Sequence, residues 1–420
     1  MMGPLNVVRA LPFLCLASAA NIPSQQTASH EIRATAADDT VYDAIIVGGG
    51  PGGLSALSGL ARVKRNVLLL DSGEYSSDAA REMHDVLDSD GVTPAYYRYA
   101  ARQELSYYST THMMNATALR IYPNVQPYYI KDYSYIVQTQ NTKKSTSIGD
   151  DCTFSARKII LATGLRYILP STPGIAENWG KGILWDPWSN GYEHAGQSLG
   201  ILSNLTNVPS LVSEILTLNS DIIAFVNGTD TPENRAATEA LFPQWEAYLK
   251  LHNVTVENRT LASITRLRDG GQNNTVTNLS TAPEYDLFRV NFVGCGDSIE
   301  RAVFLSNFSA VEESTVGEAL GVRLDGGRLA ADPSQGFLTN LPGVYAIGDA
   351  NADNVTNVPH ALYTGKQSAV HLHIQLALDD ANNELTGNGS STAAVELDPR
   401  AVWDMMNGKP GDLLYAGKFE

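Results

Sequence analysis

The sequence is poor in cysteine. Three cysteines occur in 420 residues, and one of them, Cys15, lies in an apolar N-terminal run. The other two, Cys152 and Cys295, form neither a Cys-x-x-Cys pair nor a metal-binding spacing, which excludes a disulfide-rich scaffold and a cysteine-based metal site. A disulfide between these two residues and two separately buried thiols both remain open.

Basic residues and long apolar stretches are also scarce. The chain has 29 Lys and Arg against 45 Asp and Glu, a formal net charge of −16, which argues against nucleic acids and anionic membrane surfaces as partners. After the N-terminal run, no segment reaches the roughly eighteen apolar residues of a membrane-spanning helix, so we expect no membrane anchor. A hydrophobic content of 43% in a chain of this length predicts a globular protein with two domains.

The N-terminus has the pattern of a secretory signal. Arg9 precedes the run ALPFLCLASAA, which ends in small residues and is too short to span a bilayer. We therefore expect a signal peptide over residues 1–20, a polar linker over 21–39, and a secreted or vesicular protein. Ten Asn-x-Ser/Thr sequons, none with Pro in the middle, predict a glycoprotein. Their asparagines are Asn115, Asn204, Asn227, Asn253, Asn258, Asn273, Asn278, Asn307, Asn354 and Asn388.

The most specific motif is a dinucleotide-binding fingerprint. Residues 41–53, VYDAIIVGGGPGG, read as a strand, a glycine-rich turn and the start of a helix. Gly48 allows the tight turn, Gly50 lets the backbone approach a pyrophosphate, and Gly53 lets the helix pack closely on the sheet. Asp71 ends the next strand, NVLLLD, where its carboxylate can accept hydrogen bonds from ribose hydroxyls.

The remaining patterns predict a first domain that is split by a second. The first domain is expected from residues 40–170 and 315–385, the second from residues 175–310, and a polar tail from 386–420. Within the second domain, LGILSNLTNVPSLVSEILTL reads as strand, turn and helix, and ATEALFPQWEAYLKLHN reads as a single helix. A further helix is expected to begin at Glu300.

Three blocks of sequence carry a resemblance to a known family. VGGGPGGLSA, KIILATG and GVYAIGDA occur in this order and, with the inserted α/β unit, resemble the thioredoxin reductase-like branch of the flavoproteins with two dinucleotide-binding domains. LPSTPGIAENWGKGIL and NGYEHAGQSLGIL are similar to the fungal dithiol oxidases of the gliotoxin and holomycin type. The resemblance implies an α/β fold with two Rossmann-like, three-layer ββα domains, the second inserted into the first, and a homodimer.

The resemblance also implies FAD in the first domain. The fingerprint and Asp71 would hold its ADP half, and Asp349 would bond its ribityl chain. The helix that begins near His360 would direct its N-terminus at the flavin. The residues implied in cofactor binding are Gly48, Gly50, Gly53, Asp71, Gly164, Gly348, Asp349 and His360.

Two departures from the family pattern decide the expected function. The family's redox motif is Cys-x-x-Cys-Asp-Gly followed by an aromatic residue and Glu, and here residues 186–193 read DPWSNGYE. Disulfide exchange needs a thiolate, which Asp186 and Ser189 do not supply. The family's second glycine-rich turn is replaced by SNLT at residues 203–206, so no glycine remains to approach a pyrophosphate. A glycan on Asn204 would obstruct the same place.

Electrons are therefore expected to enter from an organic substrate. We expect an FAD-dependent oxidase or dehydrogenase that takes a hydride from a small aromatic or polyketide-like secondary metabolite and passes the electrons to O₂ without NADPH. The alternatives are a redox-neutral FAD-dependent cyclase or isomerase, a decayed reductase that only binds a metabolite, and a relative of the dithiol oxidases.

Six residues are predicted to contact or react with the substrate. A catalytic role would be to hydrogen-bond or deprotonate the substrate, and aromatic rings would stack a flat substrate. The alternative is that Asp186 only caps the next turn and His360 only bonds to backbone. His371 and His373 lie on different faces of a helix, so we expect no metal site. The catalytic candidates are Asp186, Ser189 and His360, and the substrate-binding candidates are Trp185, Trp188 and Tyr192.

Overall fold

The computed structural model describes residues 40–124, 134–141, 151–273 and 279–387. Predictions about the signal peptide, the linker, Asn278, Asn388 and most of the C-terminal tail lie outside these ranges. The described residues all belong to one compact unit. Within the described parts of the chain, no helix combines the length and the apolar character that crossing a membrane requires.

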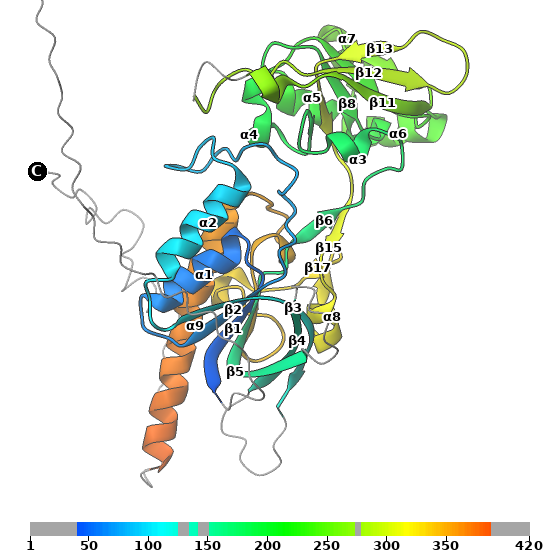
Figure 1. Ribbon diagram of the computed structural model, residues 1–420. Coiled ribbons are helices and arrows are strands. Elements are labelled where there is room, and N and C mark those ends of the chain that lie inside the picture. Colours follow the sequence, from blue (N-terminus) through cyan, green and yellow to red (C-terminus); the bar gives the residue numbers. More distant parts are fainter. Residues whose placement is uncertain (1–39, 125–133, 142–150, 274–278, 388–420) are drawn as a thin grey trace, which may run out of the picture. The chain divides into compact units, whose positions relative to one another are not determined.

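The strands form two main sheets, and helices follow several of the strands along the chain (Figure 1). The first sheet and its surroundings consist of β1 (Val41–Val47), α1 (Pro51–Ala61), β2 (Val67–Asp71), α2 (Pro94–Leu105), β3 (Thr111–Pro123), β4 (Tyr135–Asn141), β5 (Asp151–Leu161), α8 (Val316–Leu320), β16 (Leu324–Asp325), β17 (Arg328–Leu329), β18 (Val344–Ala346) and α9 (Val358–Gly387). The inserted part consists of α3 (Ile175–Asn178), β7 (Ile183–Leu184), α4 (Pro187–Asn190), β8 (Leu199–Leu202), α5 (Val208–Ile215), β9 (Ile222–Phe225), α6 (Pro232–Leu241), α7 (Trp245–Leu251), β10 (Thr255–Glu257), β11 (Leu261–Arg268), β12 (Leu287–Phe292), β13 (Ile299–Arg301) and β14 (Val303–Ser306). The antiparallel strands β6 (Leu165–Tyr167) and β15 (Ala310–Glu312) pair where the chain enters and leaves this part.

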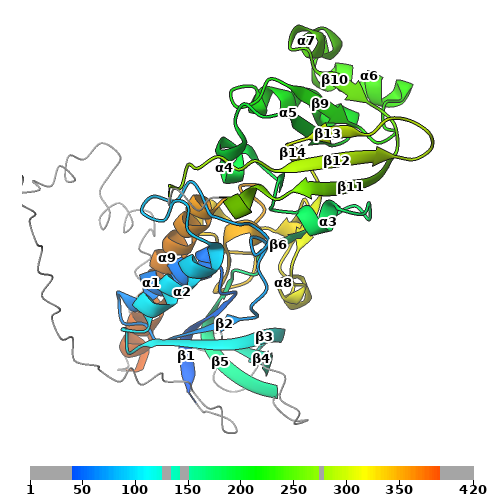
Figure 2. The same cartoon turned by 45° about the horizontal axis from the view of Figure 1, so that its top comes forward.

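The first sheet has a parallel and an antiparallel part (Figure 2). β1 pairs in parallel with β2 and β5, β2 with the first half of β3, and β5 with β18. From Ala116 onward β3 turns to an antiparallel partner, β4, which also pairs with the start of β5. β3 and β5 thus belong to both parts. The meander packs on one face of the parallel strands, and the helices α1 and α9 pack on the other.

Alternation along β1 produces the two cores of this layered arrangement. Ile45 packs against Val137 of the meander, whereas its neighbour Ile46 packs in the cluster that contains Leu57 of α1 and Leu372 of α9. Successive strand residues point to opposite faces of a sheet. Each of these side chains is fully buried, which is worth about 1.5–3 kcal/mol apiece.

The second sheet is parallel throughout, in the order β10-β9-β8-β14-β7. A separate antiparallel sheet, β11-β12-β13, packs beside it through the cluster that contains Phe225, Phe288 and Phe304. The predicted α/β class with Rossmann-like parallel sheets is confirmed. The proposed domain boundaries stay a prediction.

Two local predictions about the inserted part are wrong. The single helix expected over residues 237–253 is two helices, because Pro243 disfavours helical backbone at Phe242, whose φ and ψ are −136° and 86°. Glu300 does not begin a helix; it lies in β13, where it pairs across the strands with Arg289.

Neither reading of the two cysteines holds. Cys152 and Cys295 are both free, so they form no disulfide, and they are not two buried thiols, because Cys152 is only partly buried and Cys295 is exposed.

Candidate functional site

A cavity of about 280 Å³ opens at the carboxyl ends of the parallel strands of the first sheet. The turns after β1 and β5 line it at Gly48 and Gly164, and the segment after β18 lines it at Asp349. In open parallel sheets, ligands bind at this edge because the turns there expose backbone N–H groups and helix N-termini. The cavity is therefore the candidate site.

The glycines of the glycine-rich turn differ in the room that they leave for a side chain. Gly48 has φ +121°, and a Cβ there would lie 2.1 Å from the Ala162 carbonyl oxygen. At Gly53 a Cβ would lie 2.0 Å from the Gly48 carbonyl oxygen. Gly50, by contrast, has nothing within 4 Å of a Cβ and lines the cavity at the N-terminus of α1. The chain itself thus requires Gly48 and Gly53, whereas the space at Gly50 is left for a ligand.

Asp71 ends β2 with a buried carboxylate that the chain already binds. Its oxygens accept hydrogen bonds from the Gly73 N–H at 3.0 Å and the Tyr75 hydroxyl at 2.7 Å, and Arg102 donates at 2.6 Å. Asp71 is not among the residues that line the cavity. Its contact with a ribose therefore stays a prediction.

The segment after β18 brings a buried acid to the cavity. The Gly348 N–H donates to the Thr364 hydroxyl at 2.9 Å, which fixes the turn on which Asp349 lies. Burial raises the pKa of Asp349 to about 6, although nearby Arg328 and His360 oppose the shift. The carboxyl can therefore act as a hydrogen-bond donor below that pH and as an acceptor above it.

The segment that replaces the family's thiols lies beside the cavity. Trp185, Asp186, Trp188 and Ser189 all line it. Asp186 caps α4 by accepting from the Ser189 N–H at 2.8 Å, and the Ser189 hydroxyl donates to the Asp186 carbonyl at 3.1 Å. Burial raises the pKa of Asp186, while these hydrogen bonds act in the opposite direction. Asp186 thus both caps α4 and lines the cavity.

Two predicted site residues do not reach the cavity. Tyr192 is 63% exposed and is not among the lining residues. His360 is also outside the lining, and its Nε2 lies 2.6 Å from the Asp353 carboxylate. Its ring packs edge-on against Phe337. Roles for these two residues in the reaction stay predictions that this geometry does not favour.

The histidine that lines the cavity is His84, which follows β2. Its side chain is 8% exposed, and its Nε2 is buried without a hydrogen-bond partner. Three carboxylates surround the ring: Asp90 is 3.4 Å from Nδ1, and Glu82 and Glu193 are 3.8 and 3.9 Å from Nε2. The sequence places His84 in a loop with no motif, so only its position beside the fingerprint's second strand could have indicated it.

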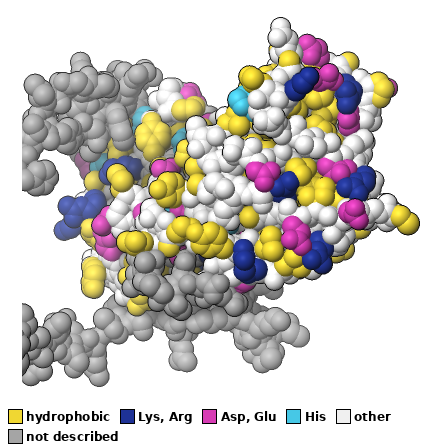
Figure 3. Space-filling view, turned by 90° about the horizontal axis from the view of Figure 1, so that it is seen from above, with side chains coloured by type: hydrophobic (Ala, Val, Ile, Leu, Met, Phe, Trp, Pro, Cys, Tyr) yellow, Lys and Arg dark blue, Asp and Glu magenta, His cyan; other side chains and the backbone are white. Residues whose placement is uncertain are grey.

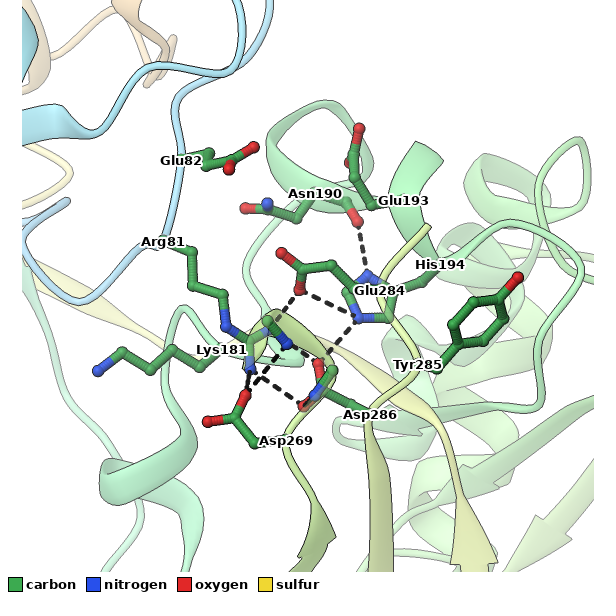
Figure 4. A network of polar contacts seen from close by, with 12 residues as sticks. Arg81, Glu82, Lys181, Asn190, Glu193, His194, Asp269, Glu284, Tyr285 and Asp286 are labelled. Atoms are coloured by element: carbon green, nitrogen blue, oxygen red, sulfur yellow. Dashed lines mark hydrogen bonds and ion pairs between the residues drawn. The ribbon is translucent and has the colours of Figure 1, made fainter. Parts of the chain in front are cut away.

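Arg81, in the same loop, reaches the inserted part of the chain. Figure 4 shows its side chain extending from the segment before α2 toward carboxylates of the inserted part. Its guanidinium bonds Asp286 at 2.8 and 3.0 Å and Asp269 at 2.5 Å, and also contacts Glu284. Arg266 adds a 2.5 Å bond to Asp286. This network joins the loop that carries His84 to the inserted part.

Asp286 is the centre of this network and is fully buried. Burial alone would raise its pKa, but hydrogen bonds from His194, Arg81 and the Gly270 N–H outweigh it and hold the pKa well below its usual range. His194, Glu284 and Asp286 also have the ligand spacing of a metal site. Because Arg81 already occupies both carboxylates, a cation there would meet a guanidinium, and we assign the group to the ion network.

Glu312 is a partly buried residue with buried carboxylate oxygens that sequence reasoning missed. It lies on β15 opposite Leu165 of β6, and neither carboxylate oxygen has a hydrogen-bond partner. Burial raises its pKa to about 8, against the opposing effects of the Leu329 backbone and Arg328. The next residue, Glu313, lines the cavity.

We expect Glu312 to make the protein less stable as the pH rises. The folded chain keeps a proton on this carboxyl up to about pH 8, whereas the unfolded chain releases it near 4.5, so stability falls between these values. Glu312→Gln should remove about 1–3 kcal/mol of that fall, allowing for partial exposure. Urea unfolding of wild type and variant at pH 5 and pH 8 measures this difference. If the free energy of unfolding falls equally in both proteins between the two pH values, the assignment is refuted.

The turn after β8 differs from the turn after β1. Residues 203–206 lead into a 3₁₀ turn, Leu205–Asn207, before α5 begins at Val208. The Leu205 N–H donates to the Thr229 hydroxyl at 3.1 Å, so the chain itself satisfies a donor that would face a phosphate.

Comparison with known proteins places the chain in a family. Residues 42–186 match the model of the pyridine nucleotide-disulphide oxidoreductases. The chain is 41% identical over 371 residues to a probable thioredoxin reductase of Arthroderma benhamiae, covering 86% of this chain and 87% of that protein. The chain belongs to the thioredoxin reductase-like pyridine nucleotide-disulphide oxidoreductases. This protein is therefore an oxidoreductase of a flavoenzyme family.

Two further likenesses support the same placement. Thioredoxin reductase tcpT of Claviceps purpurea is 31% identical to this thioredoxin reductase-like protein over 199 residues, which cover 46% of this chain and 57% of that protein. The crystal structure of HlmI has a TM-score of 0.66 at 24% identity, covering 83% of this chain and 96% of that one. The structural likeness shows a shared fold, as the sequence blocks had implied.

FAD is the cofactor of this family, and the cavity of this thioredoxin reductase-like protein fits it. The open space at Gly50 and the N-terminus of α1 suit a pyrophosphate. Positive φ at Gly164 and Gly348 lets the backbone of two more turns border the cavity closely. The residues that would hold FAD are thus drawn from the turns after β1, β5 and β18.

Proposed function

We propose that this protein is an FAD-dependent oxidase or dehydrogenase for a small, flat organic metabolite, with O₂ as the electron acceptor. It would use neither NADPH nor disulfide exchange. The observation that carries the proposal is the position of Asp186 and Ser189, which line the cavity where the family pattern has its two redox cysteines. A carboxylate and a hydroxyl do not exchange with disulfides, but they do hydrogen-bond a substrate.

The chain's own groups suit a substrate that loses a proton. When bound, FAD accepts a hydride and can return the electrons to O₂ as hydrogen peroxide. Trp185, which stacks on Tyr167, and Trp188 both line the cavity, and aromatic side chains there suit a flat molecule. Asp186, whose pKa burial raises, can accept the proton of a substrate hydroxyl.

Under anaerobic conditions, NADPH is expected to leave the flavin absorbance of the purified protein unchanged, because residues 203–206 offer no turn for its pyrophosphate. A substrate metabolite should bleach the flavin, and in air it should release one hydrogen peroxide per product. Flavin absorbance and a peroxide assay with candidate metabolites measure both. Rapid bleaching by NADPH would contradict the proposal, and turnover without peroxide would indicate the redox-neutral alternative.

A matched variant separates the two lost features. Asp186→Cys combined with Ser189→Cys restores the thiols but not the second turn, so NADPH should still fail to reduce the flavin. Reduction of this variant by NADPH would show that the inserted part still binds the nucleotide.

We also propose that the protein is a secreted or vesicular glycoprotein, acts as a homodimer, and binds neither nucleic acids nor membranes. The pattern of residues 1–20 and the sequons support the secreted glycoprotein, and the net charge of −16 argues against nucleic acids and anionic membranes. The homodimer rests on the family resemblance alone. The face in Figure 3 carries acidic and basic side chains interspersed, with no gathering of Lys and Arg. Such a face offers no continuous positive surface to a phosphate backbone.

A further inference from the structure

Three of the ten sequons meet at one cavity in the inserted part. Asn204, Asn227 and Asn307 follow the ends of β8, β9 and β14, which are neighbours in the second sheet. All three line a cavity of about 160 Å³ whose walls are otherwise largely apolar, with Phe225 and Phe308 among them. Ten sequons spread evenly over the chain would place fewer than one among the residues lining so small a cavity.

The three side chains are compatible with an attached sugar. Each is exposed, and within the described residues none of their Nδ2 atoms donates a hydrogen bond. The Asn227 Oδ1 accepts from the Leu261 N–H at 2.8 Å, which orients the amide and leaves Nδ2 free. Asn204 makes no capping bond to the turn that it begins. The fold can thus carry a glycan at each position without losing a hydrogen bond.

The three asparagines share the edge of the second sheet at which a ligand would be expected to bind. In parallel α/β sheets, ligands bind at the carboxyl ends of the strands. A branched sugar on each of three adjacent strand ends would surround the cavity mouth. A dinucleotide could then not approach it, whatever residues formed the turn.

We propose that Asn204, Asn227 and Asn307 are N-glycosylated together and that their glycans close this edge of the second sheet. In the transfer, the asparagine Nδ2 bonds to C1 of the first sugar as the bond from C1 to a lipid pyrophosphate breaks, and the amide gives up a proton. The proposal rests on the entry into the secretory pathway given above. The inserted part would then carry carbohydrate instead of nucleotide and serve as the support of α4 beside the first cavity.

Site occupancy is the direct test. The full chain and a version with a yeast leader in place of residues 1–20 are expressed in yeast, and the secreted protein is treated with an amidase that converts each glycosylated Asn to Asp in heavy-oxygen water. Peptide mass spectrometry should show conversion of all three residues in most molecules. An unconverted residue among the three in protein secreted behind the yeast leader would overturn the joint closure, whereas a full chain that stays inside the cell would overturn only the proposed localisation.

Closure itself is tested with the dye 8-anilinonaphthalene-1-sulfonate, which fluoresces on apolar surfaces. The variant with Asn204, Asn227 and Asn307 all changed to Gln should bind the dye at the exposed cavity mouth and fluoresce several-fold more than wild type. The control is Asn253→Gln, whose sequon does not line the cavity. Equal fluorescence of the triple variant and this control would refute the closure even if all three sites carry sugar.

Discussion

Arg81→Met is expected to lower the free energy of unfolding by about 3–5 kcal/mol. The side chain bonds Asp286, which is fully buried, and contacts Glu284, which is 3% exposed. Without the guanidinium, the His194 ring, whose Nε2 is 3.7 Å away, is the side chain left within ion-pair distance of the Glu284 carboxylate among the described residues. A buried carboxylate that loses its partner keeps its desolvation cost, which is why the expected loss is large. Urea unfolding of the FAD-loaded protein, followed by tryptophan fluorescence, measures it.

A surface pair provides the control for this prediction. Arg289 and Glu300 form an ion pair in which both side chains are nearly half exposed. Arg289→Met should therefore cost no more than about 1 kcal/mol. Adding Glu284→Gln to Arg81→Met should recover part of the loss, because it removes the unpaired charge. A loss at Arg81 as small as that at Arg289 would mean that the network does not hold the loop.

Gly50→Val is expected to weaken FAD binding by two to three orders of magnitude, or roughly 3–4 kcal/mol. The φ and ψ of Gly50 are −73° and −178°, an extended backbone that valine adopts readily. Nothing of the chain lies within 4 Å of its Cβ position, so the side chain would occupy only the space that a pyrophosphate needs. Equilibrium dialysis of the cofactor, together with unfolding of the FAD-free protein, separates binding from stability.

Gly53→Ala is the comparison for this variant. A Cβ there would lie 2.0 Å from the Gly48 carbonyl oxygen, so α1 must move away from the sheet. We expect Gly53→Ala to lower the stability of the FAD-free protein, and Gly50→Val to leave it within about 0.5 kcal/mol of wild type. If Gly50→Val bound FAD normally, the assignment of this turn to the pyrophosphate would be wrong.

Local patterns in the sequence were enough to predict the first βαβ unit and the family. Residues 41–71 contain the apolar strands, the glycine spacing and the terminal acid in one continuous stretch. A strand, a turn and a helix start are each decided by residues close in sequence. The prediction of one helix over residues 237–253 failed for a local reason too. The apolar spacing favoured a continuous helix, but Pro243 interrupts it.

Side-chain partners were not predictable in this way. His360 has a motif-like position at a helix start, yet it pairs with Asp353, whereas His84, in a loop without pattern, lines the cavity. Arg81 and Asp286 are 205 positions apart in the chain, and no periodicity links them. Only the packing of the inserted part against the loop after β2 brings their charges together.

The sequence by itself carried the prediction of which family chemistry this protein does not use. The absence of cysteines at residues 186 and 189 and of glycines at 203–206 predicts neither disulfide exchange nor a nicotinamide donor, because each function requires particular atoms. The tertiary structure alone decided what now occupies those places: Asp186 and Ser189 beside the first cavity, and three sequons around the second. The reason is that the sequence gives the identity of each residue, whereas the packing of the sheets decides which side chains become neighbours.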